Sequence, residues 1–138
     1  MKGIRRRHTR PEILLRRLMW SLGLRYRCND DRLPGSPDIV NRTNRWAIFV
    51  HGCYWHGHPG CKRATMPKRN AEFWAAKIES NRRRDAAKVE ALRRLEFEVV
   101  VVWECEVYRM ARFGVEHAPP DLLRLMRRLT GAGESRTS

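Results

Sequence analysis

The sequence predicts an α/β fold with a mixed β-sheet flanked by helices, because helix-type and strand-type patterns interleave along the chain. The strongest strand pattern is Glu-Val-Val-Val-Val-Trp at residues 98–103, whose nearly unbroken apolar run is typical of a central strand covered on both faces. The strongest helical pattern lies in residues 13–22, where apolar side chains recur at helical spacing. With 138 residues and no internal repeat, the chain fits one domain over residues 1–130, with a basic arm at 1–8 and a flexible tail at 131–138.

Three segments carry helix signals: residues 10–22, 71–95 and 122–129. Thr9 fits the N-cap of a capping box with Glu12, and Gly23 ends this first helix. Asn70 can cap the long second helix, and Asp121 can cap the short last one. The segment before the last helix contains two adjacent prolines and is expected to be a linker.

Three further segments carry strand signals: residues 24–28, 38–40 and 45–50. Residues 24–28 alternate apolar and basic side chains, which predicts a half-exposed strand. Residues 41–44, Asn-Arg-Thr-Asn, have the composition of a turn. The strands on either side of this turn are therefore expected to form a hairpin.

The chain is strongly basic, with 29 lysines and arginines against 15 acidic residues, a formal net charge of +14 and a pI near 10.9. This excess favours a polyanionic partner, with nucleic acid ahead of a membrane or an acidic protein. No apolar stretch is long enough to span a membrane, and no apolar segment of a secretory signal follows the basic arm. We therefore expect an intracellular protein whose four cysteines are thiols or metal ligands rather than disulfides.

Residues 51–61 concentrate ligand-type side chains, namely three of the five histidines and two of the four cysteines. In this Gly/Pro loop, Cys53, His58 and Cys61 have a spacing that can fold three ligands around one ion. Zinc takes four thiolate or imidazole ligands in a tetrahedron, and Cys105 is the natural fourth, because its strand can lie beside the strand that precedes the loop. The choice among the three histidines stays open, and the alternative is that the cysteines are ordinary buried thiols.

Two carboxylates are candidates for a catalytic site. Asp38 begins a strand after a Pro/Gly loop, where a carboxylate can hold Mg²⁺ together with a substrate phosphate. The spacing favours equally a turn aspartate that caps its own backbone. Glu12 lies in the first turn of the first helix and is by itself a capping residue, and Glu104 fits a surface charge at a strand end.

Aromatic residues cluster in and after the ligand loop. Tyr54 and Trp55 lie where burial is difficult, and exposed aromatics on so basic a protein suit base stacking or wedging between base pairs. Phe73 and Trp74 share a helix start, where one is expected in the core and the other outside. The remaining tryptophans are expected in the core: Trp20, Trp46 and Trp103.

Five strings of residues occur in order within residues 1–105: Pro11-Glu12, Leu33-Pro34-Gly35-Ser36-Pro37-Asp38, Phe49-Val50-His51-Gly52-Cys53-Tyr54-Trp55-His56, Glu72-Phe73-Trp74 with Lys77-Ile78 and Asn81, and Val102-Trp103-Glu104-Cys105. In these strings the chain resembles the very-short-patch (Vsr-type) DNA mismatch repair endonucleases of bacteria. The third and fifth strings are specific in combination.

The resemblance implies a restriction-endonuclease-like fold with a structural zinc site, and a Mg²⁺-dependent DNA endonuclease. Family members cut one strand next to the T of a T:G mismatch left by deamination of 5-methylcytosine. By this resemblance, Asp38 would bind the catalytic Mg²⁺ with help from the backbone carbonyl of Val50. His51 and His56 would serve the chemistry, one of them handling the proton of the attacking water, and Glu12 would lie near the active site.

The resemblance also implies the zinc ligands and the residues that enter the duplex. The zinc ligands would be Cys53, His58, Cys61 and Cys105, with one residue more between His58 and Cys61 than in a known family member. The wedge beside the mismatch would be Tyr54, Trp55 and Trp74. Met1 aligns with a methionine that enters the minor groove in family members, so most of the segment before it is expected to be absent.

Two other functions fit the same patterns. One is a zinc-stabilised DNA-binding module without catalysis, and the other is a nuclease of relaxed specificity. For the mismatch endonuclease, the expected partner is double-stranded DNA with a T:G mismatch, and mismatch-repair proteins are candidate partners. The chain is then expected to be a monomer without membrane association, located in the bacterial cytoplasm at the nucleoid.

Overall fold

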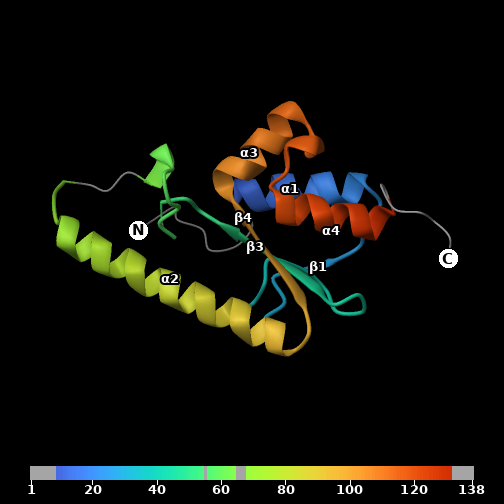
Figure 1. The fold of residues 1–138 in the computed structure, drawn as a ribbon, viewed down its shortest axis with the longest axis horizontal. Helices are drawn as coiled ribbons and strands as arrows, with labels where there is room; N and C mark the ends of the chain where they lie inside the picture. Colours follow the sequence, from blue (N-terminus) through green and yellow to red (C-terminus); the bar gives the residue numbers. More distant parts are fainter. Residues whose placement is uncertain (1–8, 55, 65–67, 132–138) are drawn as a thin grey trace.

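The computed structural model of the chain describes residues 9–54, 56–64 and 68–131. A sheet lies in the middle of the molecule with helices on both of its faces (Figure 1). In chain order the elements are α1 (Arg10–Ser21), β1 (Arg27–Cys28), β2 (Ile39–Asn41), β3 (Trp46–His51), η1 (Lys62–Ala64), α2 (Ala71–Arg94), β4 (Glu98–Trp103), α3 (Glu104–Phe113), η2 (Val115–His117) and α4 (Pro120–Thr130).

Several predictions concern residues outside this description. They are the basic arm at residues 1–8, the roles of Met1 and Trp55, and residues 132–138 of the tail. The single domain over residues 1–130 stays a prediction. Within the described part of the chain, no helix is both long enough and apolar enough to cross a membrane.

The sheet is mixed, as the sequence predicts, with the strand order β1-β2-β3-β4. β2 and β3 form the expected antiparallel hairpin, in which Ile39 pairs with Ile48. β3 and β4 run parallel, in a register that pairs His51 with Trp103. Because parallel neighbours end at the same edge, the segments after β3 and β4 leave the sheet side by side. The predicted strand at residues 24–28 is reduced to the two residues of β1.

The prediction of a central position for β4 is wrong, because β4 is the last strand of the sheet among the described residues. Its apolar run has another cause. Val100 and Val102 pack into a cluster with Leu125 of α4, whereas Val99 packs with Leu92 of α2 on the opposite face. Helices therefore cover both faces of β4, and the apolar pattern reports this cover rather than the lateral position of the strand.

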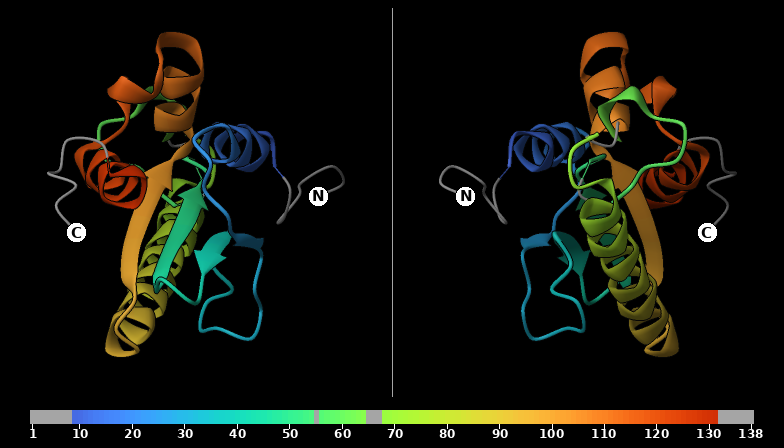
Figure 2. Two further views of the ribbon diagram at one scale, coloured as in Figure 1. Left: turned by 90° about the vertical axis from the view of Figure 1, so that its right-hand side faces the viewer. Right: turned by 90° about the vertical axis from the view of Figure 1, so that its left-hand side faces the viewer.

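Two apolar clusters, one on each face of the sheet, form the core. One cluster joins α1, α3 and α4 to the sheet through residues such as Leu15, Met110 and Leu125. The other cluster joins α2 to the sheet through Leu92 and Phe49. Figure 2 shows this division, with α2 alone on its side of the sheet. The long helix α2 therefore covers the face of the sheet opposite to α1, α3 and α4.

α3 occupies part of the segment that was expected to be a linker, so that prediction is wrong for these residues. The helix begins directly after β4, where the backbone N–H of Trp103 donates a hydrogen bond to the Glu106 carboxylate at 2.8 Å. Val107 and Met110 are its buried residues. Tryptophan is not a typical N-cap residue, so the start was not recognised. As a result, Cys105 lies in the first turn of a helix.

Two predicted helix caps differ in the structure. α2 begins after Asn70, but Asn70 has a φ of 59° and its side chain makes no capping hydrogen bond. α4 begins at Pro120 with Pro119 in the N-cap position, and Asp121 instead binds Arg124 at 3.1 Å. Proline suits the first helical position because its fixed φ matches the helix and no intrahelical N–H bond is lost there.

The tryptophans expected in the core have different surroundings. Trp46 is buried, with 1% of its surface exposed, and Trp103 is half-buried. Trp20 is 53% exposed, which contradicts the prediction. It follows the buried Met19 on α1 and so points about 100° away from the buried face of the helix. Its ring lies 3.9 Å from the guanidinium carbon of Arg25.

Candidate active site and metal centre

Three cysteines and one histidine meet where the segments after β3 and β4 leave the sheet. Their ligand atoms all lie within 4.8 Å of one another: Cys53, His58, Cys61 and Cys105. The loop after β3 supplies three of them, and α3 supplies Cys105. Of the three histidines in the loop, His58 is the one that the fold brings to the cysteines. The fourth cysteine of the chain, Cys28, is exposed and lies outside the cluster.

Backbone hydrogen bonds hold the ligand loop in shape. The N–H of His58 donates to the carbonyl of Cys53 at 2.9 Å, and the N–H of Cys61 donates to the carbonyl of His58 at 3.3 Å. The N–H of Cys53 donates to the Glu104 carboxylate at 3.1 Å, so Glu104 is not the plain surface charge that was expected. The His58 ring stacks on Trp103 with 4.2 Å between centroids. These contacts join the loop to the start of α3.

The cluster fits a tetrahedral metal ion. Metal–thiolate bonds of about 2.3 Å place sulfur atoms roughly 3.8 Å apart in a tetrahedron, which four atoms within 4.8 Å can reach with small movements. Burial raises the pKa of the Cys53 thiol to about 12 and also raises the pKa of Cys105. Thiols so reluctant to ionise become thiolates readily only when a cation compensates the charge. Soft sulfur and imidazole donors favour zinc-like ions over Mg²⁺.

A second cluster joins His51 and His56 to Asp85, a residue that the sequence analysis did not single out. Nδ1 of His56 lies 2.5 Å from Oδ2 of Asp85, and Nδ1 of His51 lies 3.9 Å from the same oxygen. The two rings are stacked, with 4.0 Å between centroids and 6° between planes. Asp85 lies on α2 seven residues from each of the buried residues Ile78 and Leu92. A carboxylate at an inward position of an apolar stripe is the signal that could have revealed it.

The histidine cluster lowers the pKa values of His51 and of Asp85 below their ordinary values. Burial lowers the pKa of His51 to about 4, and the nearby His56 lowers it further than the Asp85 carboxylate raises it. His51 is therefore neutral at pH 7. Burial on its own would raise the pKa of Asp85, but the hydrogen bond with His56 and the charges around it hold this pKa below its ordinary value. Asp85 is therefore ionised and serves as a hydrogen-bond acceptor.

Asp38 lies just before β2, next to the end of β3. The backbone N–H of Val50 donates to Oδ2 of Asp38 at 2.6 Å. The Asp38 carboxylate therefore accepts a hydrogen bond from the neighbouring strand β3. Burial raises the pKa of Asp38 to about 7, and the Glu12 carboxylate adds to this rise. A cation beside this buried carboxylate would favour its ionised form, so Asp38 is a candidate metal ligand.

Glu12 reaches the same region from the first turn of α1. It is buried, with 2% of its surface exposed, and it binds Arg16 at 3.0 Å. Arg16 also donates to Oδ1 of Asn29 at 3.0 Å. Thr9 is the N-cap residue as predicted, but its hydroxyl donates to Glu12 at 3.3 Å instead of capping the backbone. The capping-box prediction is therefore wrong, and Glu12 is more than a helix cap.

The aromatic residues form a cluster between the ligand loop and the start of α2. Tyr54 and Trp74 meet edge to face at 6.1 Å, and Phe73 and Trp74 do so at 5.2 Å. Phe73 is 61% exposed and Trp74 is half-buried, so the prediction that one of them is in the core is wrong. The structure therefore presents aromatic surface beside the cysteine–histidine cluster.

Known proteins match this chain. A family model described as DNA mismatch endonuclease Vsr matches residues 1–63. A type II nicking enzyme of Xanthomonas oryzae pv. oryzae, V.XorIIP, is 47% identical over 107 residues, which cover 78% of this chain and 78% of that protein. The chain belongs to the Vsr family.

Two further Vsr-family relatives have similar coverage. V.NmeAIP, a type II nicking enzyme of Neisseria meningitidis, is 42% identical over 111 residues, which are 80% of this chain and 79% of that protein. The DNA mismatch endonuclease Vsr of Escherichia coli is 41% identical over 105 residues, which are 76% of this chain and 67% of that protein. The Vsr-family chain described here is accordingly a DNA endonuclease.

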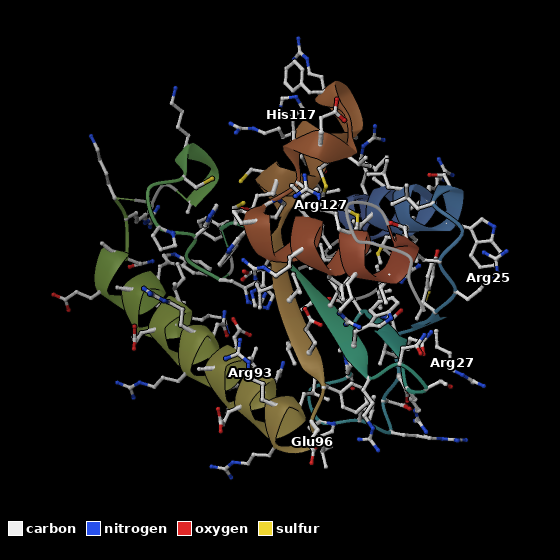
Figure 3. All side chains as sticks on the ribbon, turned by 45° about the vertical axis from the view of Figure 1, so that its right-hand side comes forward. Arg25, Arg27, Arg93, Glu96, His117 and Arg127 are labelled. Atoms are coloured by element: carbon white, nitrogen blue, oxygen red, sulfur yellow. The ribbon has the colours of Figure 1, made fainter. Side chains whose placement is uncertain are left out.

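The Vsr-family endonuclease has a pocket of about 560 Å³ beside the histidine cluster. It lies between α2 and β4, and its lining includes His51, His56, Asp85, Arg82, Arg93 and Trp103. Basic side chains are not confined to this pocket. Figure 3 labels Arg25 and Arg27 near β1, Arg93 on α2 and Arg127 on α4. The positive charge is therefore spread over several elements, and its sum attracts a polyanion such as DNA at long range.

Proposed function

We propose that this endonuclease nicks one strand of duplex DNA next to the T of a T:G mismatch, with Mg²⁺ held at Asp38. The observation that carries the proposal is the junction of Val50 and His51. The N–H of Val50 binds the Asp38 carboxylate at 2.6 Å, and the next side chain, His51, stacks on His56 beside Asp85. Two consecutive residues of β3 thus contact both groups of the proposed site. Val50 binds the Asp38 carboxylate, and His51 stacks on His56. The hairpin that creates this junction supports a restriction-endonuclease-like fold.

Asp38 and the backbone carbonyl of Val50 would hold the Mg²⁺. When bound, Mg²⁺ supplies charge neutralisation of the scissile phosphate and activation of a water molecule. Glu12 lies close enough to raise the pKa of Asp38, so it adds negative charge to this region and strengthens its attraction for a cation. Arg16 offsets part of that charge and keeps the Glu12 carboxylate in place.

His56 is assigned as the acceptor of the water proton. Its Nδ1 faces Asp85, so the other ring nitrogen is left for the substrate side, and the carboxylate stabilises the imidazolium that forms. His51 is less suited to this step, because burial lowers its pKa to about 4 and makes it a weak base. Neutral His51 instead orients the stacked His56 ring and can donate a hydrogen bond to a phosphate oxygen.

The four clustered ligands Cys53, His58, Cys61 and Cys105 would hold Zn²⁺ in a closed site without catalytic water. Such a site fixes the loop that carries Tyr54 and Trp55. We assign these two residues, with Trp74 and Met1, to the wedge in the duplex. A T:G pair is held less firmly than a matched pair, so wedging requires the least work at the mismatch, and this difference becomes selectivity.

The test uses the purified protein with Mg²⁺ and two duplexes that differ only in one base pair, T:G or T:A. Nicking next to the T of the T:G duplex, with at least roughly hundredfold slower cutting of the T:A duplex, is the expected result. Equal cutting of both would instead show a nuclease of relaxed specificity. Binding to both without cutting of either would show a DNA-binding module and would overturn the proposal.

A further inference from the structure

Lys88 is a basic residue in an unusual place on α2. It lies three residues after Asp85 and four before the buried Leu92, so it shares the sheet-facing side of the helix with them. Its side chain is half-buried, whereas Lys77 on the same helix is exposed. A lysine on the inward side of a helix gives up part of its hydration, and this placement calls for a partner of opposite charge.

The stem of Lys88 is held by the loop that leads to Asp38. Gly35 in this loop has a φ of +76°, and a Cβ atom built on it would lie 2.6 Å from Cβ, 2.7 Å from Cγ and 3.0 Å from Cδ of Lys88. Only a residue without a side chain can therefore sit here. The Gly35 backbone therefore lies alongside three carbons of the lysine stem, three residues before Asp38, and leaves no room for a side chain between them.

The charge of Lys88 reaches groups from three separate elements. It acts to lower the pKa of Asp38, of His51 and of Asp85, which lie before β2, at the end of β3 and on α2. Yet within the described residues the Lys88 ammonium makes neither an ion pair nor a hydrogen bond. In the part of the chain that the structure describes, this positive charge acts on all three groups without a direct contact, and it is therefore open to a group of the substrate.

We propose that the Lys88 ammonium contacts a non-bridging oxygen of the phosphate that is cut, and that Lys88 is a further catalytic residue of this endonuclease. The inference rests on the proposed function, because it places the scissile phosphate between Asp38 and His56. A fixed positive charge there stabilises the negative charge that develops on the phosphate oxygens during cleavage. Gly35 acts as the positioning residue, since its bare backbone allows the lysine stem to pass.

The test compares Lys88→Met, which keeps most of the stem and removes the charge, with Lys88→Arg, which restores a charge. Arg83→Met is the matched control, because it removes the same charge from an exposed position on α2. The readout is the single-turnover nicking rate at saturating DNA and saturating Mg²⁺, alongside the dissociation constant for DNA. At saturation, the measured nicking rate does not depend on the affinity for the metal or for the duplex.

Lys88→Met is expected to slow nicking by about a hundredfold, with less than about a threefold change in the dissociation constant. Lys88→Arg should recover at least part of the rate, and Arg83→Met should cut as fast as wild type. A Lys88→Met protein that cuts at the wild-type rate, or one that loses only DNA affinity, overturns the inference. So does a loss of melting temperature that accounts for the loss of rate.

A scissile phosphorothioate tests the contact itself. If Lys88 touches one oxygen, sulfur at that oxygen should slow the wild type much more than it slows Lys88→Met, in one diastereomer only. Equal sulfur effects in both proteins for both diastereomers would contradict the contact.

Wild type and Asp38→Ala serve as references. An inactive wild type overturns the proposed function and this inference together, whereas an active wild type, an inactive Asp38→Ala and a fully active Lys88→Met overturn this inference alone.

Discussion

Nδ1 of His56 lies 2.5 Å from Oδ2 of Asp85, although the two residues are 29 positions apart in the chain. The loop that carries His56 also carries three residues of the cysteine–histidine cluster, and Asp85 belongs to α2, the longest described helix. Their hydrogen bond therefore connects the loop of this cluster to the helix that covers one face of the sheet. It also fixes the orientation of the His56 ring, which the proposed proton transfer uses.

Asp85→Asn tests this relationship. The amide keeps the size of the side chain but cannot stabilise an imidazolium, so the nicking rate should fall by roughly 10²–10⁴-fold. DNA affinity should stay within about threefold of wild type. Glu79→Gln changes an exposed carboxylate earlier on α2, and as the control it should leave the rate unchanged. Single-turnover kinetics measure both, and wild-type cutting by Asp85→Asn would remove His56 from the proton-transfer role.

Asp38→Asn tests the burial of the Asp38 charge in protein without added Mg²⁺. Because burial raises the folded-state pKa from the ordinary 3.8 to about 7, the group stabilises the fold fully below pH 3.8 and loses this contribution as the pH rises through 7. The neutral amide avoids the loss. The variant should therefore gain up to about 4 kcal/mol in unfolding free energy over wild type at pH 8, and much less at pH 4.5.

Thermal unfolding at the two pH values measures this difference. Asp30→Asn is the control with the opposite sign, because the hydrogen bond from Arg42 lowers the pKa of Asp30 and its charge stabilises the fold at neutral pH. Asp30→Asn should gain nothing at pH 8. If Asp38→Asn is less stable than wild type at pH 8, the Asp38 carboxylate is not a strained cation site.

Cys105→Ser tests the metal centre. Loss of one of four ligands should release zinc and lower the melting temperature, because metal binding in small zinc sites contributes on the order of 10–16 kcal/mol to folding. Cys28→Ser is the matched control, since Cys28 is an exposed cysteine outside the cluster. Metal content by mass spectrometry and thermal unfolding provide the readouts. One bound zinc per chain in Cys105→Ser, with the wild-type melting temperature, would contradict the assignment.

Trp74→Ala tests the aromatic wedge. Removal of a ring that stacks on a base should weaken binding to the T:G duplex by about 1–3 kcal/mol and reduce its preference over the T:A duplex. Trp20→Ala is the control, because Trp20 is an exposed tryptophan on α1, outside the aromatic cluster. Competition binding with the two duplexes gives the preference directly. Equal losses for both duplexes would show that Trp74 supplies general affinity rather than selectivity.

Local patterns in the sequence predicted much of this molecule. The hairpin of β2 and β3, the long helix α2 and the apolar strand β4 follow from periodicity and turn composition, which are properties of adjacent residues. The meeting of Cys53, His58, Cys61 and Cys105 was expected because the strand before Cys105 could lie beside the strand that precedes the ligand loop. Each of these predictions needed only short-range information and one topological rule.

The predictions that failed depended on tertiary packing. Asp85 reads as one charge among many on a basic helix, and only the stacking of α2 on the sheet brings it to His56. β4 looked central because helices cover both of its faces, which a sequence cannot distinguish from strands on both sides. Trp20 is exposed because it lies one position beyond the buried face of α1, although its size suggested burial.

The most direct test of the central claim is the single-turnover nicking of a T:G duplex by wild type and by Asp38→Ala in saturating Mg²⁺. Wild type is expected to cut next to the T, and Asp38→Ala is expected to cut at least about a thousandfold more slowly, with DNA affinity and fold retained. A folded Asp38→Ala protein that cuts the same bond at a rate close to wild type would contradict it.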